Sequence, residues 1–135
     1  MATSWAAQLT NDGSGNYTVA VRRNGSIASG SAYTAPTGES AAANTIHIAL
    51  SRIRRWIMAG IQAGTISETA DNIAFNIANS AGATDAFTPT LRYGAAAASG
   101  GTVITAPLNE VSAVFRHSAI VQAMNRILND IGAGN

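Results

Sequence analysis

Residues Ile46–Ile61 read IHIALSRIRRWIMAGI, in which Ile46, Leu50, Ile53, Ile57 and Ile61 follow one another at steps of four and three residues. On a helix of 3.6 residues per turn, this spacing aligns them as a single apolar stripe. The stretch is the clearest helix signal in the chain. It predicts an amphipathic helix over about residues 40–63, with Ser40 as N-cap and Gly64 at the terminating position.

A weaker copy of this stretch lies seventy residues later. His117–Gly134 aligns with His47–Gly64 with six identities among eighteen positions, and Phe87–Pro107 aligns with Tyr17–Pro36 through an aromatic residue, Thr, Arg, Ala-Ser-Gly and Thr-Ala-Pro in order. An internal repeat constrains the whole fold, because each copy is expected to form the same set of helices and strands. We therefore predict one domain built from two divergent β-β-β-α copies, residues 1–66 and 67–135, related by a pseudo-twofold axis.

Alternating residues predict the strands. Trp5–Leu9, Tyr17–Val21 and Ile73–Ile77 each place apolar side chains at every second position, the period of a half-buried strand. Asn24-Gly25 predicts a tight hairpin into a short third strand that ends near Thr34. The second copy predicts strands over 87–93 and 101–105. Pro89 is expected at a sheet edge because it lacks an N–H for the ladder. The last helix is predicted over about 107–131, opened by Pro107 and closed by Gly132. The fold class is thus α+β with antiparallel strands and two long helices.

Composition argues against several functional classes. The chain has 135 residues, no cysteine, 11% charged residues and a net charge of +1, and all its basic residues are arginine. So few charged residues provide little electrostatic attraction for nucleic acid or an anionic membrane. No run of the sequence approaches the eighteen apolar residues that are needed to span a bilayer. Weak self-repulsion in a chain that is 47% hydrophobic favours association instead.

The chemistry-bearing residues do not form a catalytic pattern. Without lysine there is no Walker-type phosphate loop, and the glycine-rich stretches 12–15 and 94–101 are predicted to be turns leading into strands. His47 and His117 occupy matching places in the two copies but lack the carboxylate spacing of a metal site. No G-x-S-x-G elbow is present either. We predict no enzyme, no catalytic residue, no metal and no cofactor.

Two groups of residues are the predicted interface. Arg52, Arg54 and Arg55 are the one dense basic cluster, interpreted as a solvated or inter-subunit flank that makes forked hydrogen bonds, with nucleic-acid contact as the alternative. Val121, Met124 and Leu128 widen the apolar arc of the second helix beyond what one sheet face needs. Either the sister helix or another subunit covers this excess.

One resemblance follows from these residues. The stretches 17–21 (YTVAV), Asn24-Gly25, 33–41 (YTAPTGESA) and 48–50 (IAL) are similar to the hairpin-plus-helix modules of virion structural proteins from tailed bacteriophages. The match covers about residues 16–62. This helix carries arginines where the family usually has Ala and Gln, and the second copy lacks the tyrosine and the Gly-x-Ser step.

The resemblance implies a non-enzymatic, oligomeric particle component. We therefore expect a virion protein of the tail, connector or capsid-accessory type that assembles with copies of itself and with other virion proteins. Neither a nucleic-acid nor a membrane partner is expected. The alternative function is a small nucleic-acid-binding module that uses Arg52, Arg54 and Arg55.

Overall fold

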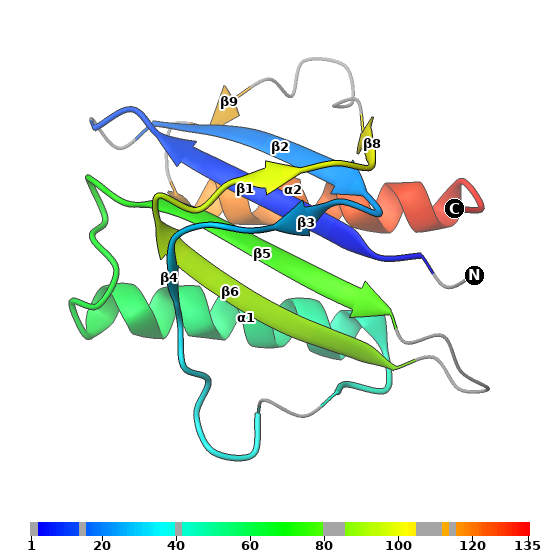
Figure 1. Ribbon diagram of the computed structural model, residues 1–135, viewed down its shortest axis with the longest axis horizontal. Helices are drawn as coiled ribbons and strands as arrows, with labels where there is room; N and C mark the ends of the chain where they lie inside the picture. The colour runs from blue at the N-terminus through cyan, green and yellow to red at the C-terminus, as the bar shows by residue number, and fades with distance from the viewer. Residues whose placement is uncertain (1–2, 14–15, 40–41, 80–85, 105–111, 114–115) are drawn as a thin grey trace.

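The computed structural model describes residues 3–13, 16–39, 42–79, 86–104, 112–113 and 116–135. Within them, an antiparallel sheet carries two antiparallel helices on one face and a small two-stranded ribbon on the other (Figure 1). The predicted α+β class is therefore confirmed. The elements in chain order are β1 (Trp5–Asn11), β2 (Tyr17–Arg23), β3 (Ser26–Ile27), β4 (Ser31–Ala32), α1 (Ile46–Gln62), β5 (Asn72–Asn79), β6 (Phe87–Gly94), β7 (Ala98–Ser99), β8 (Thr102–Ile104), β9 (Ser112–Ala113) and α2 (Arg116–Gly132).

The sheet has the strand order β4-β6-β5-β1-β2-β8, and β9 also pairs with β2. Its centre is the β1–β5 pair, in which Ala7 lies opposite Phe75. Each strand of this pair also belongs to a long hairpin: β1 pairs with β2, where Asn11 lies opposite Tyr17, and β5 pairs with β6, where Asn79 lies opposite Phe87. β3 pairs with β7 to form the separate ribbon.

The predicted alternation decides which face of the sheet is buried against the helices. Trp5, Leu9, Val21, Phe75 and Ile77 belong to the core cluster. The opposite face buries smaller residues, including Ala6, Ala74 and Ala96. The two helices complete the core with buried residues at helical spacing: Leu50, Ile53, Trp56 and Ile57 from α1, and Ala119, Ile120, Ala123 and Ile127 from α2.

The third strand and its hairpin were predicted incorrectly. The Asn24 N–H still donates to the Ser4 carbonyl at 2.6 Å, beside the last β1–β2 pair, and the Asn24 φ of 56° then turns the chain out of the sheet. The next residues form β3 on β7 and then β4 on β6, so one predicted strand is two short ones. An Asn-Gly pair predicts a tight turn, but it does not determine which strand the following residues pair with. The stretch 94–101 likewise contains β7 and is not only a turn.

Both helices start later than predicted. α1 begins at Ile46 because the Thr45 side chain accepts a hydrogen bond from the Ile48 N–H, so Thr45 and not Ser40 is the N-cap. α2 begins at Arg116, after β9, and Pro107 lies outside the described residues. The C-terminal ends lie close to the predicted ones: α1 ends at Gln62 before Gly64, which has a φ of 78°. α2 ends at Gly132, but the glycine with a positive φ after it is Gly134, at 92°.

Candidate functional site

A groove of about 280 Å³ separates the two helices on the outer side of the helix layer. We call it the inter-helix groove, and its lining consists of His47, Leu50, Ser51 and Arg54 from α1 and Val121, Met124, Asn125 and Leu128 from α2. Four of these residues were predicted as interface residues from the sequence: Arg54, Val121, Met124 and Leu128. The structure brings these four together.

The groove exists because each helix turns its most apolar face to the sheet. Ile53 on α1 and Ile127 on α2 are fully buried there. The residues one step around each helix then face the sister helix across the gap. Val121 remains 38% exposed, while Met124 and Leu128 are half-buried. The sister helix therefore lies opposite the apolar flank of α2 but leaves Val121 open to solvent.

The arginine cluster is divided between two environments. Arg55 forms an ion pair with Glu39 at 2.5 Å, and Arg52 donates to the Glu39 carbonyl at 3.4 Å. Arg54 is exposed and lines the inter-helix groove. Glu39 engages the other two arginines, so Arg54 is the arginine of this cluster that lines the groove.

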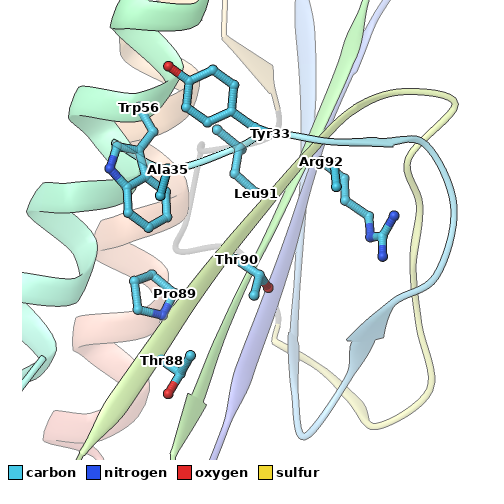
Figure 2. A pocket seen from close by; sticks show the side chains of 9 residues that line it. Tyr33, Ala35, Trp56, Thr88, Pro89, Thr90, Leu91 and Arg92 are labelled. Atoms are coloured by element: carbon cyan, nitrogen blue, oxygen red, sulfur yellow. The ribbon is translucent and has the colours of Figure 1, made fainter. Parts of the chain in front are cut away.

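A second hollow, the sheet-edge pocket of about 240 Å³, lies between α1 and the edge of β6. Its wall contains Trp56, whose indole N–H donates to the Glu39 carboxylate at 2.7 Å. Figure 2 shows Trp56 beside Ala35 and Pro89, with Tyr33 and Leu91 further along the pocket.

β4 pairs only with Arg92 and Tyr93 of β6, so Pro89 lies where no described strand adds to that side. Pro89 was predicted at such an edge. A proline there cannot donate to an incoming strand, which protects the edge from strand addition.

A polar network fixes the C-terminal end of α2 to the sheet. The Asp130 carboxylate accepts from the Trp5 indole N–H at 2.8 Å and from Arg23 at 2.6 and 2.9 Å. Asp130 is only 6% exposed. The hydrogen bonds from Arg23 hold the pKa of Asp130 below its usual range, against the opposing effect of burial, and those from Trp5 and Asn135 assist. Asp130 likewise raises the pKa of Arg23.

The two histidine positions lie apart. α1 and α2 run in opposite directions, so their N-terminal turns, which carry residues 47 and 117, lie at opposite ends of the helix layer (Figure 1). Within the described ranges, no group of three or more His, Cys, Asp or Glu residues is placed to hold a metal ion. None of the helices in those ranges has the length and apolar character needed to cross a bilayer.

Sequence reasoning missed several participants in these sites. Asn125 lines the inter-helix groove beside His47, and Glu39 binds the arginines, although no local spacing marked Asn125 or Glu39. Asp130 and Arg23 are 107 residues apart, so only the fold reveals their pairing. Comparisons with protein-family models, curated proteins and solved structures found no match to this chain.

Proposed function

We propose that this protein is a structural subunit of a tailed-bacteriophage virion, of the tail, connector or capsid-accessory type. It acts by assembling with copies of itself and with other virion proteins, and it performs no catalysis. The observation that carries the proposal is the inter-helix groove, an apolar cleft with a cationic rim on an otherwise weakly charged molecule. The resemblance of residues 16–62 to virion modules supplies the particle context.

The groove has the composition of a protein interface. Its floor contains Leu50, Met124 and Leu128, and its rim carries Arg54. Apolar residues surrounded by polar ones, with Met and Arg enriched, characterise interface cores. α1 has three arginines and no acidic residue. A complementary surface therefore brings a carboxylate to Arg54 and apolar side chains to the floor.

Introducing a charge into the groove tests the assembly proposal. Met124→Asp places a carboxylate in the half-buried apolar wall, so it should shift assemblies toward single subunits in sedimentation velocity. Val103→Asp is the matched control because Val103 is 57% exposed on β8, away from the helix layer. Oligomers that survive Met124→Asp unchanged would rule out the groove as the assembly surface.

We further propose that the chain is a fused duplication with pseudo-twofold symmetry. Three features support this. The strand order reads the same from either end when β1 and β5, β2 and β6, and β4 and β8 are exchanged. Each helix has seventeen residues, and Arg116 follows Ile46 by seventy positions. Reciprocal bonds also cross between the halves, from Arg22 to the Gly100 carbonyl at 3.2 Å and from Arg92 to the Gly30 carbonyl at 3.0 Å.

The rival function is nucleic-acid binding through Arg52, Arg54 and Arg55. Glu39 partly neutralises that cluster, which favours the assembly proposal. A titration with a fluorescent oligonucleotide at two salt concentrations separates the two functions, because several phosphate contacts give affinity that falls steeply with salt. Tight, strongly salt-dependent binding would favour the rival.

A further inference from the structure

The outer edges of β2 and β6 are interrupted at corresponding places. The gap on β2 lies between β8 and β9 and contains Val19. The gap on β6 lies between β4 and the bridge that Ala43 forms with Phe87, and it contains Pro89. Val19 and Pro89 are each the third residue of their strand, two positions after Tyr17 and Phe87. The two gaps can therefore be compared residue by residue.

A guanidinium group fills the gap on β2. Arg126 of α2 donates from Nη1 to the Val19 carbonyl at 2.6 Å, and this arginine is only 3% exposed. The matching residue of α1 is Trp56, because each is the eleventh residue of a seventeen-residue helix. The single N–H of the Trp56 indole donates to the Glu39 carboxylate at 2.7 Å. Trp56 therefore does not give the gap on β6 the donor that Arg126 gives the gap on β2.

The sheet-edge pocket lies in the gap on β6, with Pro89 and Trp56 in its lining. On this side of β6, Phe87 exchanges two backbone hydrogen bonds with Ala43, at 2.7 and 2.8 Å. Because the backbone groups of a strand alternate in direction, the Pro89 carbonyl points to the same side as that of Phe87. Proline has no N–H, so its backbone offers this side only an acceptor. An occupant of the pocket must therefore bring a hydrogen-bond donor.

The walls of the pocket also suit a guanidinium group. Tyr33 and Trp56 are aromatic, and guanidinium groups stack on aromatic faces. The one cation in the lining, Arg92, points away from these two side chains in Figure 2. Its guanidinium donates to the Gly30 carbonyl at 3.0 Å. Arg92 is thus held toward a different part of the molecule from the aromatic wall.

We infer that the sheet-edge pocket binds an arginine side chain of a partner protein. The guanidinium donates to the Pro89 carbonyl as that of Arg126 donates to Val19, and its methylene stem packs on Ala35 and Leu91. A partner strand is a poor occupant, because Pro89 cannot donate to a ladder. The inference depends on the strand pairings and is independent of the virion role and of the inter-helix groove.

The test is an NMR titration of the ¹³C,¹⁵N-labelled full chain with N-acetyl-arginine amide. The Pro89 carbonyl is observed through the amide of Thr90, so its ¹³C shift reports directly on the new hydrogen bond. We expect this signal and the Trp56 indole signal to shift and saturate, with a dissociation constant of about 1 mM. N-acetyl-citrulline amide has nearly the same shape without the charge. It should bind roughly 5-fold more weakly, because charge strengthens both the hydrogen bond and the stacking on aromatic faces.

Two variants close the pocket in different ways. Ala35→Leu adds apolar volume to the wall from a half-buried loop position, so it should abolish the shifts. Ala95→Leu is the matched control, because Ala95 is exposed and lies outside the pocket lining, and it should leave binding unchanged. Trp56→Arg gives α1 the residue that α2 has, so a guanidinium of the chain itself should occupy the pocket and block the probe. If Trp56→Arg fails to fold, Ala35→Leu decides.

Three results would overturn the inference. The first is the absence of a saturable shift, or shifts that persist in Ala35→Leu. The second is equal affinity for the citrulline probe, which would make the pocket a site for uncharged donors. The third is tighter binding of free arginine than of N-acetyl-arginine amide, which would assign the pocket to the free amino acid and not to a side chain of a protein.

Discussion

Gly101→Ala tests the crossed arrangement of the two halves most directly. Gly101 has a φ of 61°, and a Cβ added there would overlap the Arg23 carbonyl oxygen and lie 2.6 Å from the Asn24 carbonyl carbon. Both neighbours are rigid backbone of the first half. Gly100, the adjacent residue, has a φ of 72° but nothing within 4 Å of its Cβ position. Gly100→Ala is therefore a control with the same backbone strain and no overlap.

The expected cost follows from these two effects. An alanine in the left-handed region lowers the free energy of unfolding by roughly 1–2 kcal/mol. The lower conformational entropy of the unfolded alanine variant offsets roughly 0.4–1 kcal/mol of this loss. Overlap with a well-packed neighbour adds roughly 1–3 kcal/mol. We expect the free energy of unfolding to fall by about 3 kcal/mol in Gly101→Ala and by about 1 kcal/mol in Gly100→Ala.

Urea denaturation followed by tryptophan fluorescence measures both losses. The proposed duplication extends the prediction to Gly30, where an added Cβ would lie 2.6 Å from the Tyr93 carbonyl oxygen of the second half. Gly30→Ala should therefore lose as much stability as Gly101→Ala, with Gly38→Ala as its open control. Equal losses in Gly101→Ala and Gly100→Ala would refute the close crossing of the halves.

Three further predictions concern stability. Arg23 lowers the pKa of Asp130 in the folded state, so this group stabilises the protein above the unfolded pKa of about 3.9, and the contribution is lost as pH falls through the folded value. Asp130→Asn should flatten that acid dependence of the urea midpoint; an unchanged profile would contradict it. Ile127→Ala removes a fully buried side chain and should cost about 3 kcal/mol, whereas Val121→Ala in the open groove should cost under about 0.5 kcal/mol in a monomeric background. Glu39→Gln should cost under about 1 kcal/mol, because its partner Arg55 has a side chain that is 60% exposed; a larger loss in thermal unfolding would mean that Glu39 anchors more than a surface ion pair.

The candidate site was predicted in part. The flank of Val121, Met124 and Leu128 could be read from helical spacing, because residues three and four apart share a face in any helix. The sequence left open whether the sister helix or another subunit lies across from this flank, since the distance between two helices depends on the sheet beneath them. Arg52 and Arg55 were assigned to the same interface as Arg54, but the structure shows that Glu39 engages both within the chain.

The sequence alone determined the local elements of this protein. Period-two alternation defined β1, β2, β5 and β6, and the stripe of Ile46, Leu50 and Ile53 defined α1, because these patterns depend only on the geometry of one segment. Tertiary structure decided everything that joins distant segments. β4 pairs with β6, and β8 pairs with β2. Residues 5, 23 and 130 form one hydrogen-bonded network. These contacts depend on which strand edges and charged groups lie close together in the folded chain, and local sequence patterns do not contain that information.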